Sequence, residues 1–124
     1  APFVSIADDA DVARRAARLA ICHLYAPLPH SYYDHVLREQ GFSDEADACL
    51  HHVPEGRLEL AADAISDDLL DAVTISGSLA DCQKQLSRFE GIVDQVLMVN
   101  VGYGGASKSS LLNGYRDLIR LASR

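Results

Sequence analysis

Cysteine is scarce, and its placement excludes two common ways of stabilising a small protein. Only three cysteines occur, Cys22, Cys49 and Cys82, at wide spacing and without a C-x-x-C pair. An odd count without paired spacing argues against a disulfide framework and against a structural zinc site. We therefore expect reduced thiols that serve as small apolar side chains, and no bound metal.

Positive charge is scarce as well. Lys and Arg number 11 against 18 Asp and Glu, which gives a formal net charge of −7 at pH 7. Nucleic acids and anionic membrane surfaces are bound by basic faces, so neither is an expected partner. The sequence also lacks the apolar run of roughly 20 residues that a membrane helix needs, and no signal peptide opens it. Together these absences predict a cytoplasmic protein.

Internal repeats, low-complexity segments and linkers are absent too. A chain of 124 residues with a hydrophobic content of 48% can bury one core. A single domain spanning residues 1–124 is therefore expected. The patterns that do occur are those of an α/β protein.

Residues 71–105 contain the most informative of these patterns, a strand–helix–strand unit. Residues 72–76 and 96–101 are short apolar runs, which suit strands buried on both faces of a parallel sheet. A helical connection between two such strands makes them parallel and the crossover right-handed. The pattern therefore predicts that these two strands are adjacent and parallel.

The segment between the two runs has the pattern of a helix. Ser78 with Asp81 three positions later is typical of a capping box, and Gly91 suits the left-handed end of the helix. The apolar side chains that recur at helical steps of three and four are Leu79, Cys82, Leu86 and Phe89. We expect this stripe to lie on the sheet.

Further elements lie on either side of this unit. Residues 2–7 form a short apolar run that predicts a third strand. The other helical patterns fall at residues 8–25, 30–40, 44–52, 55–64, 66–71 and 109–122. On the last helix, the side chains expected to face inward are Leu111, Leu112, Tyr115, Leu118 and Ile119. On the first, Arg14, Arg15 and Arg18 are expected to form a solvated face that pairs with acids.

Two other patterns invite a chemical interpretation. Residues 102–109, GYGGASKS, come within one residue of a P-loop, with Ser107 in place of the second glycine. Since a P-loop normally opens its domain and only one helix follows here, we do not expect a nucleotide triphosphate site. The alternatives are a loop that helps to line a ligand pocket and a plain connection. The five histidines form no i, i+4 pair on one helix, so no metal site is expected from them.

Four segments, taken in order, resemble the C-terminal part of a known family. A strand runs into an acidic helix start in PFVSIADDADVARRAARLAICHLY, and a proline and tyrosine segment leads to a glycine-phenylalanine turn in LPHSYYDHVLREQGFSDEA. A short acidic helix precedes a strand ending in glycine and a hydroxyl residue in ISDDLLDAVTISGSLADC, and a glycine and an aspartate introduce the last strand in EGIVDQVLMVNV. In this order the segments resemble the luciferase-like monooxygenases, which include the coenzyme F420-dependent oxidoreductases. The sequence departs from the family at Leu79, where proline is frequent, and at Ile92 and Val93, which stand where one residue is usual.

The resemblance implies a (β/α)8 TIM-type barrel that uses FMN or coenzyme F420 for hydride transfer or oxygenation of a small organic substrate. A complete barrel needs about 250 residues. We therefore expect a C-terminal fragment, formed by the last three parallel strands with a helical insertion and inactive by itself. The family's catalytic residues would lie before Ala1. A closed barrel also agrees with the absence of lysine, proline or a bulge that would protect a sheet edge.

The loops after the two later strands emerge on the side of the sheet that carries the ligand in α/β proteins. The resemblance makes them candidates for cofactor binding. The residues proposed for this role are Gly77, Ser78, Asn100, Gly102, Tyr103 and Gly104. A second interpretation stays open, in which the chain is a small non-catalytic α/β module. Its open sheet would then be completed by self-association. In the barrel interpretation, the missing portion of the barrel would complete the sheet instead.

Overall fold

The computed structural model describes residues 2–25, 32–101 and 108–123, which divide into two compact units. The sheet unit consists of Ala1–Ala17 and Asp71–Arg124, and the helical unit consists of Arg18–Leu70. All three described strands belong to the sheet unit. No helix among the described residues has both the length and the apolar character that crossing a membrane requires.

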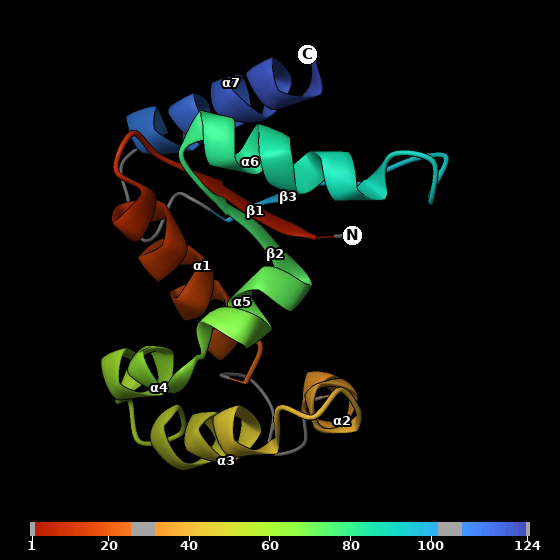
Figure 1. The fold of residues 1–124 in the computed structure, drawn as a ribbon. Helices are drawn as coiled ribbons and strands as arrows, with labels where there is room; N and C mark the ends of the chain where they lie inside the picture. The colour runs from red at the N-terminus through yellow and green to blue at the C-terminus, as the bar shows by residue number, and fades with distance from the viewer. Residues whose placement is uncertain (1, 26–31, 102–107, 124) are drawn as a thin grey trace. The chain divides into compact units, whose positions relative to one another are not determined.

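The sheet is small, open and parallel. Strand β1 (Phe3–Ile6) lies in its centre, between β2 (Thr74–Gly77) and β3 (Val99–Asn100). In the register, Phe3 lies opposite Thr74 on one side and opposite Val99 on the other. The prediction of an α/β protein with parallel strands is confirmed. The prediction that the two later strands are neighbours is wrong, because β1 separates them (Figure 1).

Both later strands are shorter than the sequence suggests. Residues 72 and 73 belong to α5 (Asp67–Val73), so β2 begins at Thr74, and β3 covers only two of the residues 96–101. A short apolar run does not distinguish the last turn of a helix from the first residues of a strand. The second run is also not buried on both faces, since Leu97 is 68% exposed.

The other described regular elements are helical. They are α1 (Ala10–His23), α2 (Tyr32–Glu39), α3 (Ser43–His52), α4 (Leu58–Ala64), α6 (Leu79–Leu86) and α7 (Lys108–Ala122), and a short 3₁₀ turn, η1 (Ser87–Phe89), extends α6. Between β1 and β2 the regular elements of the described chain are all helical, which agrees with the predicted helical insertion.

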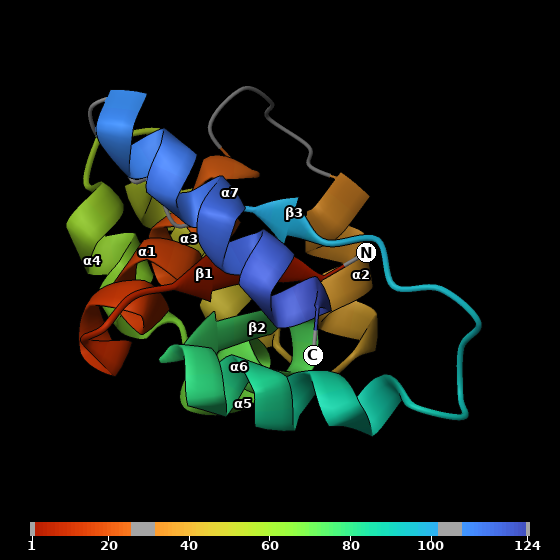
Figure 2. The same ribbon diagram turned by 90° about the horizontal axis from the view of Figure 1, so that it is seen from above.

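Helices α6 and α7 pack together on one side of the sheet (Figure 1). Helix α6 contacts β2, whereas α7 contacts β1 and β3 (Figure 2). The fully buried residues between them are Val4, Ile75, Cys82 and Leu121, and the partly buried ones that pack against this cluster include Leu79, Leu86 and Phe89. The predicted apolar stripe of α6 is therefore confirmed.

The inward face of α7 differs from the predicted one. Leu118 and Leu121 pack into the core, but Leu112, Tyr115 and Ile119 are at least half exposed. The cause is a close approach at Gly114, where an added Cβ would lie 2.5 Å from Asn100 Nδ2 of β3. Gly114, Leu118 and Leu121 follow helical spacing, so this contact fixes which face of α7 meets the sheet.

The helical unit buries both large and small side chains, with Tyr25, Leu69 and Leu70 among the large ones. Helix α3 contacts α2 and α4, and Ala46, Cys49, Ala61 and Ala62 are fully buried. Ion pairs join its surface segments, from Arg18 to Asp67 and from Arg38 to both Asp34 and Asp47. Arg18 also donates to the main-chain oxygen of Ile65 at 3.1 Å. These contacts order the exposed ends of short helices, which have little intrinsic stability.

Two substitutions on α7 test which of its faces meets the sheet. Leu121→Ala should lower the free energy of unfolding by about 2–5 kcal/mol, because it opens a cavity beside Val4 and Ile75. Ile119→Ala is the matched control, since Ile119 is 65% exposed on the same helix, and it should cost less than about 0.5 kcal/mol. Urea unfolding measures both. Equal losses would show that the face is misassigned.

Candidate functional site

The carboxyl ends of the three parallel strands meet at one edge of the sheet. Gly77 lies opposite Ile6 on one side of β1, and Asn100 lies opposite Val4 on the other. This edge is where α/β sheets hold their ligands. The fold thus brings Gly77, Ser78 and Asn100 to the expected side. The other three candidates, Gly102, Tyr103 and Gly104, lie outside the described residues.

Gly77 allows the chain to turn from β2 into α6. Its φ is +142°, a conformation that side-chain-bearing residues rarely adopt. A Cβ at this position would also lie 2.9 Å from the Cβ of Asp81. The glycine therefore has a conformational role, and the space beside it is filled by Asp81.

Ser78 is held by the helix that it begins. The Asp81 amide donates to Ser78 Oγ at 3.2 Å, while Asp81 Oδ2 accepts from the Ser78 amide at 3.0 Å and from its hydroxyl at 2.6 Å. The predicted capping box is confirmed. These hydrogen bonds hold the pKa of the Asp81 carboxyl below its ordinary value. A flavin phosphate at this helix end would face a carboxylate that already occupies it.

Asn100 packs against a neighbouring helix. Its half-buried side chain lies against Gly114 of α7 and so ties β3 to that helix. Gly77, Ser78 and Asn100 thus all serve the local structure of the sheet unit. As side-chain ligands they do not fit a flavin phosphate.

A set of buried hydroxyl groups escaped the sequence interpretation. Ser5, Thr74 and Ser76 are almost fully buried, and Ser5 lies opposite Ser76 in the register of β1 and β2. Thr74 Oγ1 and Ser76 Oγ are 3.1 Å apart, whereas Ser5 Oγ has no hydrogen-bond partner within the described chain. The sequence does contain a signal for this set, because the hydroxyl residues alternate with apolar Val4 and Ile75 along the two strands. Successive side chains of a strand point to opposite faces, so the hydroxyl groups lie on the face opposite to Val4 and Ile75.

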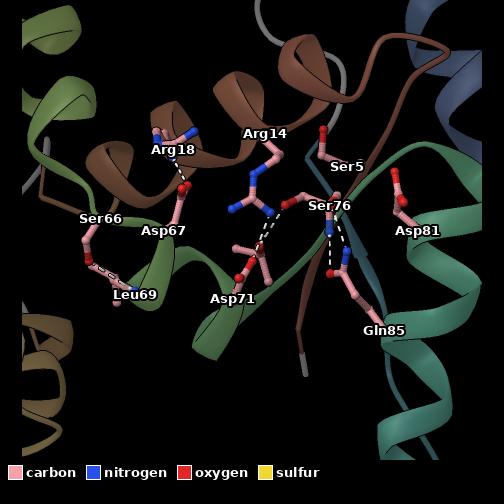
Figure 3. A network of polar contacts seen from close by, with 12 residues as sticks. Ser5, Arg14, Arg18, Ser66, Asp67, Leu69, Asp71, Ser76, Asp81 and Gln85 are labelled. Atoms are coloured by element: carbon pink, nitrogen blue, oxygen red, sulfur yellow. Dashed lines mark hydrogen bonds and ion pairs between the residues drawn. The ribbon is translucent and has the colours of Figure 1, made fainter.

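Gln85 covers part of the outer edge of β2 (Figure 3). The Ser76 amide donates to Gln85 Oε1 at 3.1 Å, and Gln85 Nε2 donates to the Ser76 main-chain oxygen at 2.9 Å. The main-chain oxygen of Gly77, the next residue, accepts from the Ala7 amide on the β1 side of the strand. Because main-chain groups alternate in direction along a strand, the amide and main-chain oxygen of Ser76 face the outer edge of β2. The side-chain amide therefore takes the place of one residue of a neighbouring strand. The edge is thus covered by a glutamine, a means of protection that the search for lysine, proline or a bulge did not include.

Arginine side chains fix the chain around the start of β2 and in the helical unit. In the sheet unit, Arg14 pairs with Asp71 at 2.9 Å, and Arg88 donates to the Asp71 main-chain oxygen at 3.3 and 3.4 Å. In the helical unit, Arg18 pairs with Asp67 (Figure 3). Arg14 and Arg18 of α1 do pair with acids, as predicted, but these acids are not local, since they lie 57 and 49 positions away in the sequence. No anion site needs to be invoked for them.

The described histidines offer no ligand set for a metal ion. The rings of His51 and His52 stack edge to face with centroids 4.7 Å apart, and Arg57 donates to His52 Nδ1 at 3.2 Å. Desolvation, followed by the charges of His51 and Arg57, lowers the pKa of His52. Within the described ranges, no three His, Cys, Asp or Glu side chains gather closely enough to hold a metal ion.

Comparison with protein-family models, with curated proteins and with solved structures finds no match for this chain. The luciferase-like resemblance therefore depends on the four sequence segments themselves.

The Gln85 contact can be tested by substitution. Gln85→Ala leaves the Ser76 amide and main-chain oxygen unpaired at the edge of the sheet, and it should cost about 1–3 kcal/mol of unfolding free energy. Gln85→Glu should cost less, because a carboxylate still accepts from the amide but cannot donate to the oxygen. Hydrogen exchange at the Ser76 amide should accelerate in both variants.

Lys84→Ala, at an exposed neighbouring position, is the control and should leave that exchange rate unchanged. An unaltered rate in Gln85→Ala would show that the Gln85 amide does not pair with the strand.

Proposed function

We propose that this chain is a scaffold portion of a flavin- or F420-dependent oxidoreductase or monooxygenase of the luciferase-like type. It contributes a parallel sheet and its covering helices, and no catalytic side chain. The observation that supports this is the unit β2–α6–β3, in which parallel strands flank a helix that begins with a glycine turn and a capping box. The resemblance predicts parallel strands on either side of this helix, but as direct neighbours, whereas β1 lies between them in this structure.

In the proposed complete protein, the sheet belongs to a (β/α)8 barrel. Consecutive barrel strands lie side by side, so β3 would then pair with the outer edge of β2 instead of with β1. At that edge, the side-chain amide of Gln85 is hydrogen-bonded to the main chain of Ser76. A strand pairing there would replace two side-chain hydrogen bonds, each with a net value of about 1 kcal/mol, by main-chain bonds. The exchange is therefore close to neutral in hydrogen-bond energy.

The cofactor, FMN or coenzyme F420, would supply the hydride or oxygen chemistry toward a small organic substrate. Among the described residues of the carboxyl edge, the Ser78 hydroxyl is already bonded to Asp81, and Asn100 packs against Gly114 of α7. Contacts of these described residues with the cofactor are therefore made mainly through main-chain groups, and we expect them to be weak.

A titration followed by amide NMR tests this proposal. With millimolar FMN or F420, shifts should appear at Ala7, Gly77 and Ser78, at the carboxyl edge, and adenosine monophosphate should reproduce few of them because it lacks the flavin ring. No turnover of aldehydes or alcohols by this chain with reduced FMN or F420 is expected. Turnover at ordinary enzyme rates would contradict the scaffold role. Absent shifts, or shifts shared equally with adenosine monophosphate, would contradict the cofactor class.

The second candidate function is that of a non-catalytic association module, and exposed apolar side chains favour it. Ile92, Val93, Leu97 and Val99 are 40–75% exposed, and they lead into and include the edge strand β3. An edge strand with apolar neighbours pairs readily with another strand. We propose a second copy of this chain as the partner, joined through this apolar segment of residues 92–99.

Light scattering at micromolar concentration measures the association. The expected mass is at least twice 13.4 kDa, and the double substitution Ile92→Ser and Leu97→Ser should return it toward the monomer because it removes apolar surface. Leu60→Ser, at a 50% exposed position of the helical unit, is the control and should leave the mass unchanged. A monodisperse monomer for the unaltered chain would rule out this function.

A further inference from the structure

The turn between α3 and α4 brings an arginine against two histidines. His51 and His52 are the last residues of α3, and Arg57 is the N-cap residue of α4. The two helices pack against each other within the helical unit (Figure 1). The Arg57 side chain reaches back across the turn to the last residues of α3, where its Nε donates to His52 Nδ1 at 3.2 Å. This hydrogen bond joins the end of one helix to the start of the next.

The rest of the Arg57 guanidinium lies close to His51. One of its terminal nitrogens is 3.5 Å from His51 Nε2 and 3.5 Å from the His51 main-chain oxygen, at the limit of hydrogen bonding. The two imidazole rings meet edge to face with centroids 4.7 Å apart. A single cation therefore faces ring nitrogens of both histidines.

The hydrogen bond to His52 requires that this ring is neutral. Arginine has only donors and stays charged, so His52 Nδ1 must accept with a lone pair, and the ring proton is on Nε2. A protonated imidazole has a donor at each nitrogen and a positive charge, so it would lose the hydrogen bond and repel the guanidinium. Desolvation, followed by the charges of His51 and Arg57, lowers the pKa of His52, which agrees with this geometry.

Neighbouring acids do not offset the positive charge that protonation would add. Glu55, in the turn itself, is 4.0 Å from Arg57 and its side chain is 64% exposed. Within the described chain, no acid forms an ion pair with either histidine. The ionisable side chains of α2, α3 and α4, the elements packed together here, are otherwise Tyr32, Tyr33, Asp34, His35, Arg38, Glu39, Asp44, Glu45, Asp47, Cys49, Glu59 and Asp63. Of these, Asp34 and Asp47 are already paired with Arg38.

We propose that the turn between α3 and α4 is a pH-sensitive joint, in which Arg57 holds the neutral His52 ring and is released when that ring is protonated. After release, the turn keeps its main-chain hydrogen bonds from the Arg57 amide to the His52 oxygen and from the Gly56 amide to the Val53 oxygen. These two bonds remain as the local restraint, so α4 opens more readily from α3.

The direction of the pH effect follows from the lowered pKa of His52. Because the folded state favours the neutral ring, the contribution of this contact to stability is complete above about pH 6.5, the ordinary pKa of histidine. It is lost as the pH falls below that value toward the pKa of the folded state. The inference does not depend on the proposed oxidoreductase or association function.

Hydrogen exchange followed by NMR between about pH 8 and pH 5 tests the joint. The Arg57 amide donates to the His52 main-chain oxygen at 3.0 Å and so reports on the turn. Its protection factor, which is corrected for the intrinsic pH dependence of exchange, should fall at least about twofold on acidification. The fall should share its midpoint with the titration of the His52 ring resonances. The Ala7 amide, bonded to Gly77 in the sheet unit, is the control and should keep its protection.

Two variants separate this joint from general acid destabilisation. His52→Asn keeps a neutral acceptor close to the position of Nδ1 and cannot be protonated, so the Arg57 amide should stay protected at low pH. Arg57→Gln removes the positive charge, so the His52 midpoint should rise. Arg120→Gln, at a 68% exposed position of α7, is the matched control and should leave that midpoint unchanged.

Three results would each overturn the proposal. They are wild-type protection at Arg57 that does not change with pH, a loss of protection that persists in His52→Asn, and a His52 midpoint that does not move in Arg57→Gln. If a variant fails to fold, the wild-type protein still decides, because a loss of protection whose midpoint differs from that of His52 also contradicts the joint.

Discussion

The parallel pairing of β1 with β2 is the contact on which the sheet unit depends. It joins residues 3–6 to residues 74–77, so the sheet forms only when the two ends of a long helical insertion come together. Such distant pairings carry a loop-closure cost before they contribute stability. The hydrophobic core then stabilises the pairing, because Val4 of β1 and Ile75 of β2 are buried in one cluster with residues of α6 and α7. Loss of that cluster would therefore release the helices together with the sheet.

Around this pairing, local side chains lie against the ends and edges of the strands. Asp81 occupies the start of α6, Gln85 pairs with the edge of β2, and Asn100 lies against Gly114 of α7. Of these three, Asn100 was a candidate ligand when only the sequence was considered. In the fold they complete the sheet unit instead. The carboxyl edge of the sheet is thus stabilised at the expense of side-chain groups that a cofactor would use.

How much the sequence predicted depended on the range of the interaction. The α6 stripe and the Ser78–Asp81 capping box involve residues three or four positions apart, so helical spacing alone predicted them. The strand order was missed because apolar runs carry no information about which strand lies between two others. For the candidate site, the sequence predicted that Gly77 and Asn100 lie at the same edge of the sheet, but not the contacts that Ser78 and Asn100 make within the sheet unit.

The cysteines show why residue type alone does not determine chemistry in this chain. All three are buried and free, as their spacing predicted, and they differ only in what the fold brings to them. Burial, and after it the charge of Asp81, raises the pKa of Cys82 to about 12, so its thiolate is unfavourable in the sheet unit. In the helical unit the pKa of Cys49 is instead lowered, with the neighbouring Cys22 thiol as the largest cause, although burial opposes this.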